Sequence, residues 1–399
     1  MQAFTFHFPT KIIFGSGKLA EAGNEAKALG QKPLLLTTRT AMQKNGALKK
    51  LTGLLASRGV SPVIFEGIEP NPHVETLDKA VALGLKERCD FVMALGGGSV
   101  MDASKAVAAA LGDAQDGVAP SVFEYTNGMM GQNRKVQKPF KLMIISGTAA
   151  TGSEGNCAAV LTKASTHEKV VLWDLGAFPT TTILDPELHL SLSLEATRDG
   201  AVDIMLHVLE QTFTGDAKAP LQDRVAEGMV LGVMECLEAA EKNLQDLTAR
   251  ENLAWASVSA LIAGGGPNFG RSGPWVIHPL EHPLSGHTDC SHGHGLAALW
   301  APVLRAMAPR VEAKIARFGQ ACLGLPKGDS SAEKTLTALE RYLADHSMAF
   351  KISQFGATAE TCRLMAADAA RIYGGGRGVV AAPVVIDQKK AEQIYLSAL

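Results

Sequence analysis

Short apolar runs rich in β-forming residues alternate with helical stretches through the first half of this chain, and this alternation restricts the fold more than any other feature. A helix after each strand brings the chain back to the edge of the sheet where that strand began, so the next strand runs parallel to it. The pattern therefore predicts a mostly parallel sheet with helices on its faces. The expected strands are residues 11–14, 33–37, 62–65, 91–95, 142–145, 170–173 and 181–184. The clearest helices expected between them are residues 17–29, 41–57 and 74–87.

The pattern changes near Asp185-Pro186, and from Leu194 onward long helical periods replace the strands. We therefore predict an α/β domain over residues 1–187 and an all-α domain over residues 188–399. A cleft between two such domains is a preferred place for a small-molecule site, and we expect the active site there. The expected helices are residues 196–212, 221–244, 247–263, 295–307, 310–323, 332–348 and 357–371.

Composition limits the class of protein. The 399 residues include 38 basic and 40 acidic side chains without a long run of like charge, which argues against a nucleic-acid-binding surface. No apolar stretch approaches the roughly 20 residues of a membrane helix, and the first residues lack a signal-peptide pattern. The six cysteines form no CxxC pair, as is typical of reduced thiols. We expect a cytoplasmic protein without membrane or nucleic-acid partners.

A glycine-rich turn follows the expected strand at residues 91–95. Gly96-Gly97-Gly98-Ser99 leads into a helix expected from about Val100. Glycines let the backbone approach an anion closely, and the N-terminus of a helix favours negative charge, so the turn suits a phosphate. We expect Ser99 to cap the helix, with Asp102 and Lys105 on one side of its first turns. The turn is not the GxGxxG fingerprint, and a purely architectural role is the alternative.

A second turn, residues 146–154, follows the expected strand at residues 142–145 and is rich in hydroxyl groups and glycine. In open α/β sheets, ligands bind at the carboxyl ends of the strands, so this turn predicts another part of a ligand site. A hydrophilic loop whose hydroxyls cap local structure is the alternative.

Histidines and one aspartate predict a metal site in the second half. Asp203 and His207 are four residues apart, so on a helix both can reach one ion, although such a pair is also typical of surface or capping contacts. Five of the eleven histidines lie between His278 and His294, in a segment that is otherwise apolar. A shared metal gives such histidines a partner. Spacing alone does not select the ligands, but imidazoles with one carboxylate suit Zn²⁺ or Fe²⁺ better than Mg²⁺ or Ca²⁺.

Taken together, these segments resemble the iron-containing (group III) alcohol dehydrogenase family, most closely its branch of butanol dehydrogenases and NADPH-dependent aldehyde reductases. The resemblance extends along nearly the whole chain, and its order and spacing make it highly specific. The segments that carry it are residues 9–17, 69–72, 96–102, 148–154, 183–188, 203–207, 278–285 and 292–293.

The resemblance implies a Rossmann-like dinucleotide-binding domain over residues 1–187 and a metal-binding and substrate domain over residues 188–399. The family's metal ligands are an aspartate, the histidine one helical turn later and two histidines fourteen residues apart. In this chain those positions are Asp203, His207, His278 and His292. His282 matches a family histidine beside the metal that contributes to the active site without ligating, and Asp199 is expected to be a bystander.

The resemblance also implies the cofactor contacts. Relatives that prefer NAD carry an aspartate at the position of Thr38, where it repels a 2′-phosphate, whereas this chain has no acid there and Arg39 follows. We therefore expect NADP(H), with NAD(H) left open. The expected contacts are Thr38, Arg39, Asn71, Gly96, Gly97, Gly98, Ser99, Asp102, Thr148, Thr151 and Lys169.

The expected reaction passes a hydride between a small alcohol or aldehyde and the nicotinamide, with His282 moving the proton and Fe²⁺, or alternatively Zn²⁺, on the substrate oxygen. The family resemblance suggests a homodimer. Gly147 replaces a usual threonine, and residues 286–291 depart from the family pattern, which leaves the substrate open. The alternatives are a glycerol dehydrogenase-like or dehydroquinate synthase-like enzyme on the same architecture, a metal-dependent hydrolase and a non-catalytic binding protein.

Overall fold

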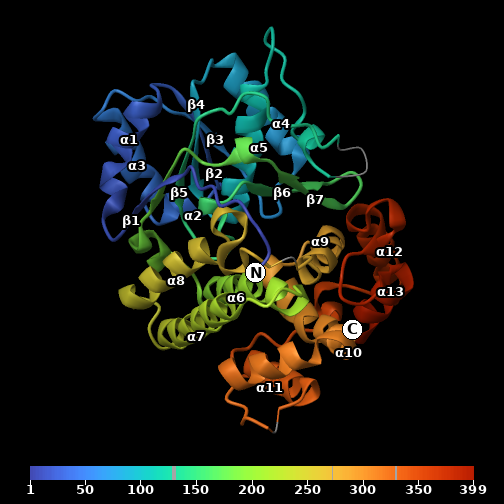
Figure 1. The fold of residues 1–399 in the computed structure, drawn as a ribbon. Coiled ribbons are helices and arrows are strands. Elements are labelled where there is room, and N and C mark those ends of the chain that lie inside the picture. Colours follow the sequence, from blue (N-terminus) through green and yellow to red (C-terminus); the bar gives the residue numbers. More distant parts are fainter. Residues whose placement is uncertain (128–131, 272, 329) are drawn as a thin grey trace. The chain divides into compact units, whose positions relative to one another are not determined.

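The computed structural model describes residues 1–127, 132–271, 273–328 and 330–399. The chain forms two compact units that interleave along the sequence (Figure 1). The sheet unit contains His7–Leu194 and Glu238–Gly264, and the helical unit contains Met1–Phe6, Glu195–Leu237 and Gly265–Leu399. An α/β region followed by a largely helical one confirms the predicted order, while the boundary between residues 187 and 188 stays a prediction.

Six strands of the sheet unit form one parallel sheet in the order β1-β8-β5-β4-β2-β3 (Figure 1). The central strands β2, β4, β5 and β8 are buried along their whole length, as continuous apolar runs in a sheet covered on both faces should be. All six strands were predicted to within one residue at each end. They are β1 (Lys11–Phe14), β2 (Pro33–Thr37), β3 (Val63–Glu66), β4 (Phe91–Gly96), β5 (Leu142–Ser146) and β8 (Thr181–Leu184).

Helices cover both faces of this sheet. Leu51 and Leu55 of α3 share a core cluster with Leu35 of β2. Leu34, which precedes Leu35 in β2, lies against α4 instead, since a Cβ added at Gly84 of α4 would be 3.2 Å from its side chain. Because successive strand residues point to opposite faces, α3 and α4 lie on opposite sides of the sheet. The helices between the strands of this sheet are α1 (Ala22–Leu29), α2 (Ala41–Lys44), α3 (Ala47–Ala56), α4 (Val74–Lys86) and α5 (Gly98–Gly112).

A separate antiparallel hairpin, β6 (Ala158–Lys163) and β7 (Glu168–Trp173), accompanies the main sheet. The strand expected at residues 170–173 therefore exists but lies outside the parallel sheet. Its partner β6 was not predicted, because only Val160 and Thr162 in that strand are β-branched.

The helical unit carries most of the remaining elements. Every residue of α6 from Gly200 to Glu210 is buried, so the polar side chains in this stretch must find partners in the interior. The helices are α6 (Leu194–Thr214), α7 (Pro220–Lys242), α9 (Ile277–Thr288), α10 (His292–Cys322), α11 (Ala332–Asp345), α12 (Ala359–Asp368) and α13 (Gln388–Ser397). Another helix, α8 (Leu247–Ala260), belongs to the sheet unit, and two short strands, β9 (Val379–Val380) and β10 (Ile386–Asp387), pair antiparallel.

Several expectations about helices differ from the structure. The helix expected at residues 17–29 begins with a 3-10 turn (Lys18–Glu21) before α1. The helices expected at residues 295–307 and 310–323 are one element, α10, with non-helical backbone at Val311. The stretch expected as one helix at residues 41–57 is divided into α2 and α3. Helix α9 was not predicted, because Pro279 and Pro283 lie within it and proline normally interrupts a helix. Within the described ranges, none of the helices combines the length and apolar character that a membrane crossing requires.

Candidate functional site

Four polar side chains of the helical unit converge, and they are the predicted metal ligands. Asp203 and His207 lie one turn apart on α6, while His278 is near the start of α9 and His292 opens α10. The Nε2 atoms of the three histidines surround one carboxylate oxygen. Asp203 Oδ1 lies 3.4, 3.5 and 3.8 Å from the Nε2 atoms of His207, His278 and His292.

This cluster fits a divalent transition metal. Asp203 Oδ1 and His278 Nε2 are buried, yet neither makes a hydrogen bond within the part of the chain that the structure describes. Buried polar atoms that face one another in this way need a shared partner. One carboxylate oxygen and three imidazole nitrogens are a donor set that suits Fe²⁺ or Zn²⁺. Potential ligand atoms of Asp203, His207 and His278 all lie within 4.8 Å of one another, close enough to share one ion.

The charges in the cluster favour a cation at its centre. Burial alone would raise the pKa of Asp203, but His207, His278 and His292 hold it well below its usual range. Burial alone would lower the pKa of His278, but Glu210 and Asp203 raise it to about 10. The surrounding carboxylates therefore stabilise positive charge beside His278, whether a proton or a metal ion carries it.

Two buried glutamates that were not predicted contact these histidines. The Nδ1 atom of His278 lies 2.6 Å from Glu210 Oε2, and the Nδ1 atom of His292 contacts Glu281 Oε2. Neither glutamate is exposed to solvent. Spacing offered a signal for Glu210, since it follows His207 by three residues and therefore shares its helix face. Glu281 lies between His278 and His282, where a carboxylate among apolar residues is itself informative.

His282 lies beside the cluster and bonds a residue that was not predicted. Its Nδ1 atom is 2.6 Å from the hydroxyl of Tyr373, which ends the π-helical segment η9 (Ala369–Tyr373). Glu281, His282 and His292 also offer ligand atoms within 4.8 Å of one another, so geometry permits a second grouping that would include His282. The role of His282 as a catalytic residue that does not ligate stays a prediction.

The predicted bystander Asp199 contacts the start of α10. It accepts a hydrogen bond from the hydroxyl of Ser291 and lies 3.3 Å from the Nε2 of His294. A Cβ at Gly293 would lie 2.5 Å from Asp199 Cβ. The absence of a side chain at Gly293 therefore allows the first turn of α10, which carries His292, to approach α6.

In the sheet unit, most of the predicted cofactor residues come after the adjacent strands β2, β4 and β5. The chain leaves β2 toward β3 on one side and leaves β4 toward β5 on the other, so the sheet order reverses between β2 and β4. Nucleotides bind at such a switch point, outside the carboxyl ends of the strands. Thr38 and Arg39 come directly after β2, and the glycine turn comes at the end of β4.

Glycines let the two cofactor turns pack together. A Cβ at Gly97 would lie 2.8 Å from Thr148 Cγ2, and a Cβ at Gly98 would lie 2.5 Å from Thr151 Cγ2. The register pairs Gly96 with Ser146, which places the turn after β4 beside the turn after β5. The structure thus brings the predicted glycine and threonine residues into contact.

The predicted cap at Ser99 is wrong. Helix α5 begins at Gly98 with Gly97 as its N-cap, and no side chain caps it. Ser99 therefore lies inside the first turn, because the helix starts two residues earlier than Val100. Its proposed role as a cofactor contact is a separate prediction that this correction leaves standing.

A buried polar network lies beneath these turns. Asp102 accepts hydrogen bonds from the hydroxyl of Ser153 and the backbone N–H of Val160. The ammonium of Lys105 donates to Ser153 Oγ and Asn156 Oδ1, at 2.8 and 2.9 Å. Burial lowers the pKa of Lys105 to about 8, although Asp102 acts in the opposite direction. The network ties α5 to the second turn.

The remaining predicted cofactor residues occupy two places in the sheet unit. The Lys169 ammonium donates to Asn71 Oδ1 at 3.1 Å, which joins β7 to the loop after β3. The hydroxyl of Thr38 is buried without a hydrogen bond to any described residue. The exposed Arg39 passes its Nε within 3.3 Å of the position that a Cβ would take on Gly67.

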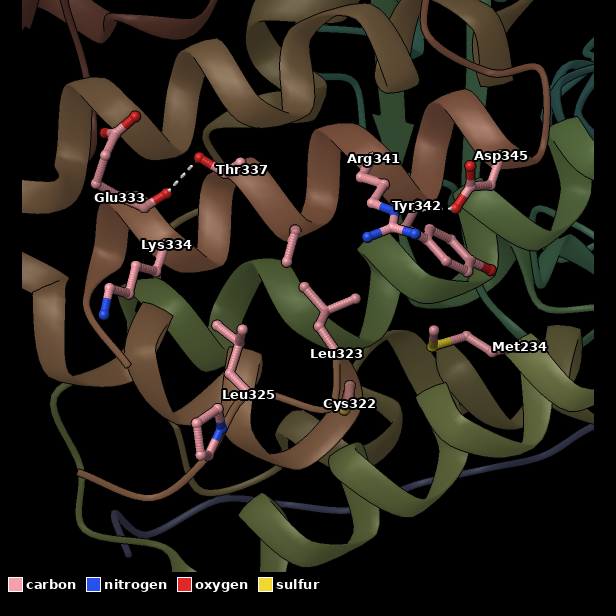
Figure 2. Close-up of a pocket in the computed structure, with 12 residues that line it drawn as sticks. Met234, Cys322, Leu323, Leu325, Glu333, Lys334, Thr337, Arg341, Tyr342 and Asp345 are labelled. Atoms are coloured by element: carbon pink, nitrogen blue, oxygen red, sulfur yellow. Dashed lines mark hydrogen bonds and ion pairs between the residues drawn. The ribbon is translucent and has the colours of Figure 1, made fainter. Parts of the chain in front are cut away.

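The helical unit also has a hollow of about 700 Å³ (Figure 2). Met234 of α7 and Cys322 at the end of α10 line it, together with charged residues of α11 such as Lys334 and Arg341. The residues that line this hollow include no histidine and none of the predicted site residues. The hollow therefore lies apart from the candidate metal centre.

Comparison with known proteins agrees with an α/β region that is followed by a helical region with a candidate metal centre. The protein-family model described as iron-containing alcohol dehydrogenase matches residues 9–186. The family model for the C-terminal part of Fe-containing alcohol dehydrogenases matches residues 197–399. NADH-dependent butanol dehydrogenase A of Clostridium acetobutylicum is 30% identical over 95% of both chains. NADPH-dependent aldehyde reductase YqhD of Escherichia coli is 28% identical over 89% of this chain and 90% of its own.

Solved structures show the same fold. The crystal structure of NADH-dependent butanol dehydrogenase A from Thermotoga maritima superimposes with a TM-score of 0.92 at 29% identity, covering 100% of this chain and 99% of that one. The fold and the buried Asp/His cluster are thus those of an oxidoreductase that acts on CH–OH groups. The chain belongs to the iron-containing alcohol dehydrogenase family. It is an alcohol dehydrogenase, so the lyase, hydrolase and non-catalytic alternatives are set aside.

Replacing Gly98 with alanine tests the packing of the cofactor turns. The new Cβ would meet Thr151, and we expect a loss of about 1–3 kcal/mol in unfolding free energy together with weaker nucleotide binding. Urea unfolding and the quenching of protein fluorescence by NADPH measure the two effects.

The matched control is Gly53→Ala on α3, where a new Cβ meets nothing within 4 Å. Alanine in an exposed helix interior should stabilise the protein by roughly 0.5–1 kcal/mol without changing nucleotide binding. Unchanged nucleotide affinity in the Gly98 variant would contradict a role for this close contact at the cofactor.

Proposed function

We propose that this protein interconverts small alcohols and aldehydes by transferring a hydride to and from NADP(H), in a reaction that depends on a divalent metal. The observation that carries the proposal is the convergence of three imidazole Nε2 atoms on Asp203 Oδ1. The names of the relatives, which include butanol dehydrogenases and an aldehyde reductase, support the substrate class. A homodimer in the cytoplasm, with domains divided near residue 187, remains the expected state.

The metal ligands in this proposal are Asp203, His207, His278 and His292. Iron(II) is the expected metal, since the family models are named for it, and Zn²⁺ accepts the same donor set. When bound, such an ion supplies Lewis-acid chemistry that lowers the pKa of the substrate alcohol. The carboxylate of Asp203 and the imidazoles of His207 and His278 are buried, while His292 is partly exposed.

His282 is the proposed proton carrier. Its Nδ1 faces the hydroxyl of Tyr373 at 2.6 Å, so the orientation of the imidazole is held from outside the metal cluster. Its ring centroid lies 5.8 Å from that of His292, so it stands beside the proposed ligand set. Alcohol oxidation yields an aldehyde, reduced cofactor and one proton, and His282 takes that proton.

The nicotinamide cofactor is assigned to the sheet unit. We infer that Gly96, Gly97, Gly98 and Ser99 contact its phosphates, with Asp102 supporting the turn. Thr148 and Thr151 lie against the glycines and are proposed to contact the nicotinamide side, while Asn71 and Lys169 complete the contacts. Thr38 and Arg39 support NADP(H) over NAD(H), because neither side chain repels a 2′-phosphate. Named relatives include both NADH- and NADPH-dependent enzymes.

The proposed reaction predicts NADPH consumption with butyraldehyde by protein that was loaded anaerobically with Fe²⁺. Absorbance at the NADPH band follows the reaction. Prior treatment with a chelator should abolish the activity, and added Fe²⁺ or Zn²⁺ should restore it. Metal-loaded protein that consumes no NADPH with a panel of short aldehydes would argue against the proposed function.

The His282→Ala variant separates a proton carrier from a ligand. We expect kcat to fall by roughly 10²–10⁴-fold, since this is the usual contribution of a general acid–base group. Metal analysis should still find the wild-type amount per chain. Loss of the metal in this variant would mean that His282 belongs to the ligand set.

The Thr38→Asp variant tests the choice of cofactor. A carboxylate here would repel a 2′-phosphate and accept from ribose hydroxyls, so the ratio of kcat/KM for NADPH over NADH should fall at least about tenfold. The Arg39→Ala variant should weaken NADPH alone. Wild-type protein that uses NADH as efficiently as NADPH would defeat the proposed preference.

A further inference from the structure

Glu210 connects α6 and α9, two of the three helices that carry the predicted ligands. It lies on α6, and its Oε1 accepts hydrogen bonds from the backbone N–H groups of Val276 and Ile277. These are N–H groups at the start of α9, which have no partner within their own helix. Its Oε2 meets the Nδ1 of His278 at 2.6 Å. One buried carboxylate thus fixes both the start of α9 and the ring of His278.

Glu281 makes a similar contact on the other side of the cluster. It lies on α9, and its Oε2 meets the Nδ1 of His292 on α10. Space for this carboxylate depends on Gly295, where a Cβ would lie 2.7 Å from Glu281 Oε1. Both predicted ligands outside α6 therefore present Nδ1 to a fully buried glutamate.

These contacts favour one tautomer of each ring when the ring acts as a metal ligand. A neutral imidazole donates from one nitrogen and offers a lone pair from the other. Both nitrogens of each ring face a carboxylate, but a metal ion would take the lone pair of Nε2, so the one hydrogen of a metal-binding ring would stand on Nδ1, where the glutamate accepts it. The Nε2 atoms of His278 and His292 are the ones that face Asp203, at 3.5 and 3.8 Å.

We propose that Glu210 and Glu281 are positioning residues that hold His278 and His292 in the tautomer whose Nε2 lone pairs point at the metal position. This inference rests on the metal ligands given under the proposed function. Partners of this kind commonly change metal affinity by roughly 10–100-fold when they are replaced.

Glutamine has nearly the shape of glutamate, but at position 210 it cannot accept hydrogen bonds from all the donors that surround the carboxylate. All three groups around this carboxylate are donors in the proposed state, namely the N–H groups of Val276 and Ile277 and the Nδ1–H of His278. A carboxamide has one accepting and one donating end. If its oxygen keeps the backbone groups, its NH₂ faces Nδ1 and favours the tautomer with hydrogen on Nε2. If it turns around, two backbone donors face an NH₂ group.

The test measures metal affinity directly. Full-length protein is stripped with a chelator and titrated with Zn²⁺ against a chromophoric competitor, and with Co²⁺ while its visible absorption is followed. We expect Glu210→Gln to raise the Kd for Zn²⁺ by about 10–100-fold and to weaken the Co²⁺ absorption that reports four-ligand geometry. Glu281→Gln should also raise the Kd. Glu333→Gln, which removes an exposed carboxylate on α11, is the matched control and should bind as the wild type does.

The outcomes separate this inference from the proposed function. Wild-type protein that binds neither ion would overturn the metal ligand set itself. Wild-type binding with an unchanged Kd and Co²⁺ spectrum in both glutamine variants would overturn only the positioning role. If Glu210→Gln fails to fold without metal, the Kd of Glu281→Gln decides the question, because Glu281 does not cap the start of α9.

Discussion

The carboxylate of Asp203 is buried among three imidazoles, and the contacts that join α6 to the starts of α9 and α10 follow from the need to satisfy it. A charged carboxylate removed from water needs compensating positive charge and polar partners. The histidines provide sites for that charge, but each imidazole has a second nitrogen that must also be satisfied. Glu210 contacts the Nδ1 of His278 and Glu281 contacts the Nδ1 of His292, so the polar cluster extends beyond the four predicted ligands.

The sheet unit solves a different problem by different means. Parallel strands bring their carboxyl ends to one edge, so turns that are distant in sequence become neighbours there. Close approach between these turns then requires that side chains be absent, and Gly97 and Gly98 leave room for Thr148 and Thr151. The buried network around Lys105 and Asp102 ties helix α5 to Ser153 of the second turn.

Much of this arrangement was predictable because periodicity is local. The six strands of the parallel sheet appeared as short apolar runs, and the four-residue spacing of Asp203 and His207 identified one helix face. Local signals failed where they conflicted or were weak. The prolines at 279 and 283 concealed α9, and the scarcity of β-branched residues concealed β6. The start of α5 was placed too late, and the expected cap at Ser99 was lost with it.

Sequence by itself determined the strand–helix alternation, the glycine and threonine turns and the spacing of the histidines. The family resemblance then selected one aspartate and three histidines as the metal ligands. Only the tertiary structure decided which nitrogen of each histidine faces Asp203, and which glutamates hold the other nitrogen. The physical reason is that a hydrogen bond depends on the distance and direction between two groups. Glu210 and His278 are 68 residues apart along the chain, and only the packing of α6 against the start of α9 brings them into contact.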